Sequence, residues 1–254
     1  MKARMAVLAC VSAIAWCGVA LAAEPSPSPV KEKLKAELER WSGNINFGLT
    51  VTSGNSDSLS LGVSAAANRK QEKHLLELAG QLLYGQTDGD DTTNRGEIMG
   101  RFSYFHSKKL FSYGEASLYY DEFRDIDVGT RLAAGVGRKF INDEKTKLNG
   151  RIGLAYTWED HGMDASDEDY VALTAGGDYS RILNENVSIT CKLSVDQDLS
   201  ESENWIANAE VALTSKLSKQ VSLIVSATDR YDNDPPPGIE ENDFTLMMAL
   251  GFAF

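Results

Sequence analysis

Apolar and polar residues alternate at every second position along most of the chain from Gly43 to the C-terminus. From Val187 to Asp196 the odd positions are Val, Ile, Cys, Leu and Val, and the even positions are Ser, Thr, Lys, Ser and Asp. A period of two predicts β-strands with one apolar and one polar face. Twelve segments of 10 to 13 residues carry the pattern: 43–52, 58–68, 75–85, 95–106, 110–121, 128–140, 146–158, 170–182, 186–197, 204–215, 220–231 and 243–254.

These segments are longer than the strands of about 5 or 6 residues that are typical of globular proteins. Their polar face consists of Ser, Thr, Asn, Gly and charged residues, so it does not supply the packed interior of a soluble sandwich. The apolar face must therefore meet lipid, and closing the sheet pairs every backbone group. We predict an all-β fold over residues 42–254: an antiparallel transmembrane β-barrel of about 12 strands. No run of 18 apolar residues occurs after residue 23, so membrane-spanning helices are excluded for the rest of the chain.

Residues 1–23 have the layout of a secretory signal peptide. Lys2 and Arg4 precede an apolar run from Met5 to Val19, and Ala20-Leu21-Ala22 offers small residues for cleavage. The alternative, a transmembrane helix, needs about 20 apolar residues. Cleavage removes two of the three cysteines and leaves Cys191 without a partner for an intrachain disulfide. A lipoprotein signal is the other alternative, but too short an apolar run precedes the first cysteine.

Residues 24–41 form a separate linker. Three prolines alternate with serines from Pro25 to Pro29, which indicates a stiff extended spacer. Leu34, Leu38 and Trp41 then follow at the spacing of one helical stripe. We expect a short periplasmic amphipathic helix that lies against the barrel rim or membrane surface, with a solvated connector as the alternative.

The predicted connections differ in length and charge on the two sides of the barrel. Those on one side hold 24 of the 37 acidic residues and only Arg124 and Arg230 as bases: 53–57, 86–93, 121–127, 159–169, 196–203 and 229–243. The turns on the other side are short and mainly basic. Long outer loops and short periplasmic turns are typical of outer-membrane barrels, so we predict Asp164 outside and Lys108 in the periplasm. Arg124 is expected to be solvated.

The formal net charge is −12, which excludes a basic nucleic-acid-binding footprint. The partners expected are outer-membrane lipid and lipopolysaccharide, and the barrel-assembly machinery during biogenesis. The chain ends on Phe252 and Phe254 at period two, which resembles the signal by which that machinery takes up barrels. Aromatic residues at the predicted strand ends are typical of the two interfacial girdles.

The first predicted strand carries a motif with the residues Trp41, Gly43, Gly48, Ser53, Gly54, Asn55 and Ser56. This opening resembles that of the salt-induced outer-membrane proteins, a family whose common domain has no assigned function. The resemblance implies a Gram-negative outer-membrane barrel linked to salt or osmotic stress, and it brings no catalytic residues. Physically, the segment from Ser53 to Asp57 suits a tight hairpin, because Gly and Asn tolerate positive φ.

Little in the sequence indicates catalysis, and we predict a protein that is not an enzyme and needs no cofactor. A barrel lipase with Ser166 and His161 is a minor alternative, because both residues lie in an irregular acidic loop without supporting groups. A weak divalent-cation site is predicted at Asp164, Asp167, Glu168 and Asp169, and a similar cluster begins at Asp88. Neither cluster has EF-hand spacing, which favours solvated loop charge.

The inward positions of the predicted strands carry a mixture of charges. The lumen charge network is predicted to comprise Glu77, Glu97, Arg101, Glu115, Arg131, Arg151, Lys192 and Glu210, with Gln81, Tyr119, Asp178 and Asn208 beside it. Hairpin symmetry places Arg101 opposite both Glu77 and Glu115. Two functions stay open: a narrow passive pore for ions or small solutes, or a non-conducting envelope barrel whose acidic loops bind divalent cations or lipopolysaccharide.

Overall fold

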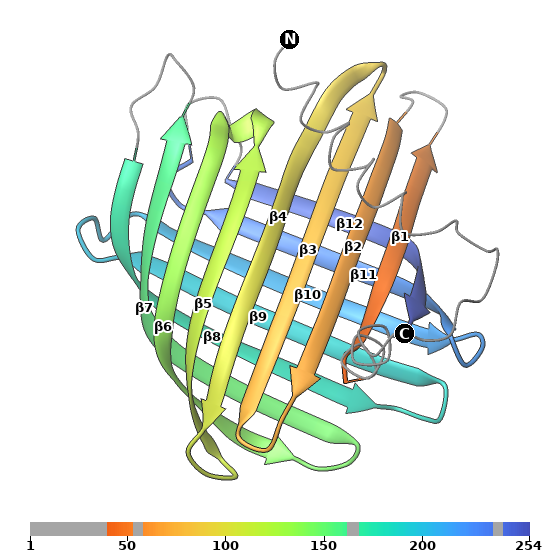
Figure 1. The fold of residues 1–254 in the computed structure, drawn as a ribbon. Helices are drawn as coiled ribbons and strands as arrows, with labels where there is room; N and C mark the ends of the chain where they lie inside the picture. The colour runs from red at the N-terminus through yellow and green to blue at the C-terminus, as the bar shows by residue number, and fades with distance from the viewer. Residues whose placement is uncertain (1–39, 53–57, 162–167, 236–240) are drawn as a thin grey trace, which may run out of the picture. The chain divides into compact units, whose positions relative to one another are not determined.

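The computed structural model describes residues 40–52, 58–161, 168–235 and 241–254. The predicted signal peptide and nearly all of the predicted linker helix lie outside these residues. Twelve strands form one closed antiparallel barrel in which β1 pairs with β12 (Figure 1). They are β1 (Ser42–Thr52), β2 (Ser58–Lys70), β3 (His74–Thr87), β4 (Asp90–Phe105), β5 (Leu110–Asp121), β6 (Ile126–Asn142), β7 (Thr146–His161), β8 (Glu168–Ile182), β9 (Val187–Asp198), β10 (Trp205–Lys216), β11 (Val221–Asp232) and β12 (Asn242–Ala253). The predicted fold class is confirmed.

The alternating sequence pattern separates the two faces of this wall. Large apolar side chains such as Ile98, Leu132 and Val136 stay 52–60% exposed on the outer face. Small or polar residues alternate with them and face inward, where Ala133, Ala155 and Thr157 are buried. The exposed apolar rows form the surface that a lipid bilayer covers in barrels of this kind. No described helix is long and apolar enough to cross a membrane.

The hairpin between β3 and β4 corrects one predicted loop. Residues 86–93 are not a long connection, because the strands continue until Thr87 pairs with Asp90. Only Asp88 and Gly89 remain as turn residues, with φ values of 54° and 90°. Positive φ at both central residues is the geometry that two-residue hairpins require, and Asp-Gly supplies it readily. The acidic cluster at this position thus builds a turn.

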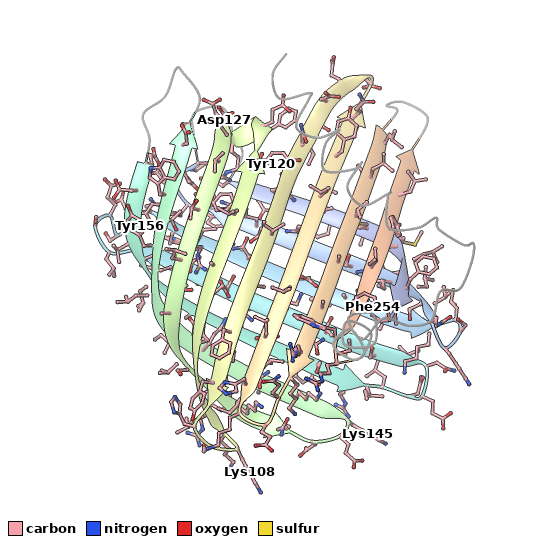
Figure 2. The ribbon with its side chains drawn as sticks, in the orientation of Figure 1. Lys108, Tyr120, Asp127, Lys145, Tyr156 and Phe254 are labelled. Atoms are coloured by element: carbon pink, nitrogen blue, oxygen red, sulfur yellow. The ribbon has the colours of Figure 1, made fainter. Side chains whose placement is uncertain are left out.

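The connections gather at two opposite ends of the barrel. Lys108 and Lys145 mark the end with the short turns, here called the turn end, and Asp127 and Tyr120 mark the other, the loop end (Figure 2). At the turn end, Ser107 Oγ accepts hydrogen bonds from the backbone N–H groups of Lys109 and Leu110 at 3.2 and 3.0 Å. The acidic loops and the short basic turns that the sequence predicts therefore lie at opposite ends of the barrel.

The barrel closes where the first strand meets the last. Gly43 N–H donates to the carbonyl of Phe254 at 3.1 Å, and Phe254 N–H donates to the carbonyl of Gly43 at 3.0 Å. The register continues from Asn44↔Ala253 to Gly48↔Ala249. A Cβ on Gly43 would overlap the Phe254 ring, and one on Gly48 would overlap the Met247 side chain. Gly43 and Gly48 of the opening motif therefore leave room for these side chains at the seam.

Candidate functional site

The lumen holds the only extended set of ion pairs among the described residues, and its register is the one that hairpin symmetry predicts. Arg101 is the cross-strand partner of Glu77 on β3 and of Glu115 on β5. Its Nε lies 2.6 Å from Glu115 Oε2, and its Nη1 lies 3.8 Å from Glu77 Oε2. The predicted register of these three residues is confirmed.

Arg131 extends this group across the lumen. Its Nη1 donates to Glu115 Oε1 at 2.7 Å, and its Nη2 donates to Thr174 Oγ1 at 3.0 Å and Asp196 Oδ1 at 2.9 Å. Since β7 and β8 separate β6 from β9 in the ring, the Arg131–Asp196 pair spans part of the lumen. The structure thus joins Glu77, Arg101, Glu115, Arg131 and Asp196 in one chain of contacts, here called the central chain.

Asp196 is absent from the predicted lumen network, because it was also counted with the acidic connection 196–203 although it closes the polar row of segment 186–197. The strand β9 continues to Asp198, so Asp196 follows Lys192 and Ser194 in the same inward row. That period-two row is the signal that would have identified it.

The other predicted lumen residues form separate pairs along the wall. Arg151 Nη1 lies 2.5 Å from Asp178 Oδ2, and Lys192 Nζ lies 3.0 Å from Glu210 Oε2. Gln81 donates to Glu97 Oε2 at 3.2 Å. Each of these pairs joins two neighbouring strands.

Two further ion pairs cross the loop end. Arg124 pairs with Asp232 of β11, which lies on the opposite side of the ring, and Arg95 of β4 pairs with Asp243 of β12. The side chains of Arg124 and Asp232 are only 14% and 4% exposed. Arg124 follows Glu122 in the short 3₁₀ turn Glu122–Arg124 (η1), and the prediction that it is a solvated loop residue is wrong, because its guanidinium is paired with the buried Asp232.

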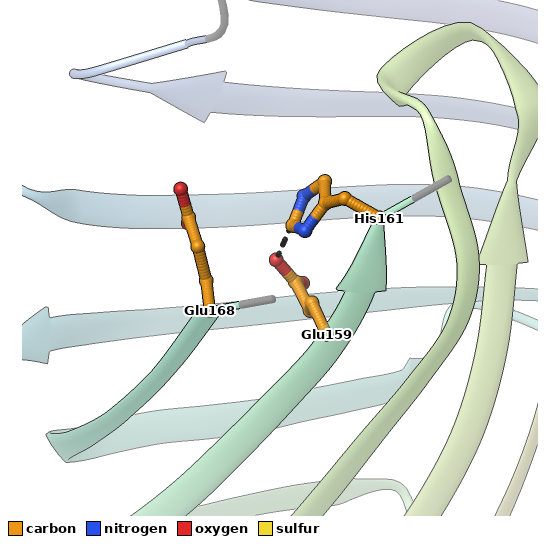
Figure 3. Close-up of side chains that lie close together, drawn as sticks. All are labelled: Glu159, His161 and Glu168. Carbon is orange, nitrogen blue, oxygen red and sulfur yellow. Dashed lines mark ion pairs between the residues drawn. The ribbon is translucent and has the colours of Figure 1, made fainter. Parts of the chain in front are cut away.

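A third group lies where β7 ends and β8 begins, and it contains Glu159, His161 and Glu168 (Figure 3). Of the predicted cation site, Asp164 and Asp167 lie outside the described residues, as does Ser166 of the lipase alternative. The two described members diverge: Glu168 belongs to this group, whereas Asp169 accepts a hydrogen bond from the Tyr156 hydroxyl at 3.3 Å. Adjacent residues of a strand face opposite sides, which explains the divergence.

The opening motif and the C-terminal aromatic residues lie on the closing seam. Trp41 is half-buried, whereas Ser53, Gly54, Asn55 and Ser56 lie outside the described residues. Phe252 and Phe254 are 44% and 63% exposed, and the Phe252 ring meets Phe47 edge-on at 6.3 Å between centroids.

A closed strand wall with an apolar exterior and a charged interior defines a β-barrel of the outer-membrane type. The chain belongs to the family described as "Protein of unknown function, DUF481", whose model matches residues 45–254. "Uncharacterized protein YdiY" from Escherichia coli (strain K12) is 24% identical over 217 residues, which cover 84% of this chain and 83% of that relative.

Two solved structures share the fold. The NanC porin has a TM-score of 0.53 at 8% identity, with 83% of this chain and 98% of that chain covered. The COG4313 outer membrane channel from Pseudomonas putida F1 has a TM-score of 0.52 at 12% identity, with 84% and 95% covered. At these identities the likeness concerns the barrel architecture, which porins and channels use.

Proposed function

We propose that this chain is a narrow, water-filled channel for ions or small solutes in the outer membrane. The observation that carries the proposal is the solvent exposure of charged side chains in the lumen. Glu77, Asp178, Lys192 and Glu210 face inward, yet their side chains are 34–57% exposed. A lumen that admits water along charged walls is the minimum that conduction requires.

The central chain forms the proposed constriction. The guanidinium groups of Arg101 and Arg131 are both bound to Glu115, and Arg131 reaches Asp196 on the far side of two intervening strands. Arg101, Glu115, Arg131 and Asp196 are 12–19% exposed, which is less than the 34–57% of Asp178, Lys192 and Glu210 on the wall. A solute must therefore pass beside this chain of ion pairs, which favours small ions over large solutes.

The acidic loop end supports weak cation selectivity. Clefts lined by charge of one sign raise the local concentration of counter-ions. The Debye length is about 8 Å at physiological ionic strength, so crowded carboxylates repel one another unless cations screen them. Added salt relieves that repulsion, and this response accords with the salt or osmotic role that the family resemblance implies.

The outer-membrane location and the export route belong to the same proposal. The location is supported by the exposed apolar wall and by the fold shared with the NanC porin. Export through a cleaved signal peptide is supported by the composition of residues 1–23. Lipopolysaccharide and the barrel-assembly machinery are the expected partners there.

Single-channel recording tests the channel. Purified protein in planar bilayers should show small, uniform conductance steps, and a salt gradient should give a reversal potential of the cation-selective sign. Arg131→Ala removes the side chain that spans the lumen and should raise the conductance. Arg181→Ala, which changes an exposed arginine on β8, is the matched control and should conduct like the parent.

A non-conducting envelope barrel is the second candidate, because two ion pairs cross the loop end. Arg124 and Asp232 come from opposite sides of the ring, and Arg95 and Asp243 are separated by three strands. If neither the parent nor Arg131→Ala conducts while both are correctly folded, the channel proposal is refuted and the envelope barrel is favoured.

A further inference from the structure

Three metal-ligating side chains converge at the loop end of the lumen without belonging to the central chain. One donor atom each from Glu159, His161 and Glu168 lies within 4.8 Å of the others (Figure 3). Glu159 and His161 are two residues apart on β7 and so share a face, and Glu168 of β8 is the cross-strand partner of Glu159. The close approach thus follows from the register of two neighbouring strands.

His161 is the unusual member of this group. Its side chain is only 10% exposed, and its Nδ1 is buried with no hydrogen-bond partner among the described residues. Its Nε2 lies 4.0 Å from Glu159 Oε2, which is too far for a hydrogen bond. Buried polar groups of native proteins are nearly always hydrogen-bonded, so a buried imidazole nitrogen without a partner among the described residues points to a ligand at this position.

A hydrogen bond from a neighbouring tyrosine orients the Glu159 carboxylate. The Tyr119 hydroxyl donates a hydrogen bond to Glu159 Oε1, which leaves Oε2 on the side of His161. In protein metal sites, a carboxylate ligand is commonly oriented by a hydrogen bond from a second group, and the Tyr119 hydroxyl occupies that position here. Glu168 is exposed, so its side chain is free to rotate toward the other two.

We propose that Glu159, His161 and Glu168 bind a Zn²⁺ ion at the loop end of the barrel. An imidazole nitrogen with two carboxylates is a donor set that suits zinc, whereas Ca²⁺ and Mg²⁺ prefer oxygen ligands alone. Metal–ligand distances near 2.1 Å place tetrahedral donors about 3.4 Å apart, so the present 4.8 Å spacing must contract. Rotation of the exposed Glu168 supplies this contraction. Three protein ligands leave a fourth position for water.

A bound ion would have three structural effects. It would neutralise the repulsion between Glu159 and Glu168, and it would give the buried imidazole a partner. It would also join the loop ends of β7 and β8 directly. Zn²⁺ binding is measured without any current, so its test does not depend on whether the barrel conducts.

The proposal is tested by competition between the purified full chain in detergent and a chromophoric Zn²⁺ indicator. One Zn²⁺ per chain should bind, and equal concentrations of Ca²⁺ should not displace it. His161→Ala should weaken binding at least tenfold. Tyr119→Phe, which removes only the orienting hydroxyl, should weaken it by about 10–100-fold while the chain keeps its heat-modifiable folded form.

Asp169→Asn is the matched control, because this neighbouring carboxylate faces Tyr156 instead. Its Zn²⁺ affinity should equal that of the parent. If His161→Ala does not fold, Glu168→Gln replaces it, since this exposed side chain makes no described contact that folding depends on. Parent-like affinity in His161→Ala or Glu168→Gln, or equal competition by Ca²⁺, overturns the proposal.

Discussion

Glu115 is the hub of the central chain, and its neutralisation should destabilise the barrel more than any surface charge. Its two carboxylate oxygens accept from Arg101 at 2.6 Å and from Arg131 at 2.7 Å, and its side chain is 12% exposed. Glu115→Gln keeps the size of the side chain but leaves two guanidinium groups facing an uncharged amide. Cutting a buried ion pair by removing one partner costs about 3–5 kcal/mol.

The free energy of unfolding should fall by less than this range in Glu115→Gln, because both arginines keep another carboxylate. Arg131 keeps Asp196 at 2.9 Å, and Arg101 keeps the more distant Glu77 at 3.8 Å. Water also reaches the lumen, as the exposure of the wall pairs shows. We therefore expect Glu115→Gln to lower the free energy of unfolding by about 2–3 kcal/mol. For a chain of this size the loss corresponds to a Tm shift of about 4–12 °C.

Reversible urea unfolding in lipid vesicles measures this loss, with the shift between folded and unfolded gel mobility as the readout. A double-mutant cycle with Arg131→Met isolates the Glu115–Arg131 term, because the two residues are in direct contact. Glu115→Gln should cost less in the Arg131→Met background than in the parent, because only the pair with Arg101 is then left to lose. A loss under about 0.5 kcal/mol, the range of ordinary surface substitutions, would refute the assigned hub.

Three other outcomes are expected. Arg101→Ala should lower the Tm more than Arg181→Ala, because Arg101 is 14% exposed and bound to two carboxylates whereas Arg181 is exposed; equal losses would contradict the lumen assignment. In cells that carry Cys191→Ser, an impermeant thiol reagent should label Asp127→Cys and not Lys108→Cys, and the opposite pattern would invert the topology. Gly135→Ala should cost about 1–3 kcal/mol by overpacking, because its Cβ would lie 2.2 Å from the Ile152 carbonyl oxygen. Urea unfolding measures this loss, and Gly114→Ala is the matched control, because nothing lies within 4 Å of its Cβ. Equal stability of the two variants would show that the wall relaxes at Gly135.

The family motif has a structural explanation that needs no ligand. Gly43 and Gly48 allow the first strand to approach the last, and Gly43 exchanges two backbone hydrogen bonds with Phe254. A motif at the start of the chain and aromatic residues at its end therefore meet at one seam. Any function of the family is better sought in the lumen and at the loop end.

The sequence by itself determined the strand wall and its local register. A period of two assigns each side chain to lipid or lumen, and a short hairpin fixes which residues of neighbouring strands face each other. Glu77, Arg101 and Glu115 were therefore placed correctly from sequence, since each contact crosses one hairpin. The Asp88-Gly89 turn was mistaken for a loop because acidic composition suggested solvent, although Asp-Gly is itself a hairpin signal.

Only the tertiary structure decided which distant strands meet across the lumen. Arg131 with Asp196, and Arg124 with Asp232, are separated by two or more strands, and no hairpin relates them. Their contacts depend on the strand tilt and stagger with which the sheet closes, which arise from the whole ring at once. The same closure brings Arg124 out of solvent, where the linear sequence showed only an acidic loop.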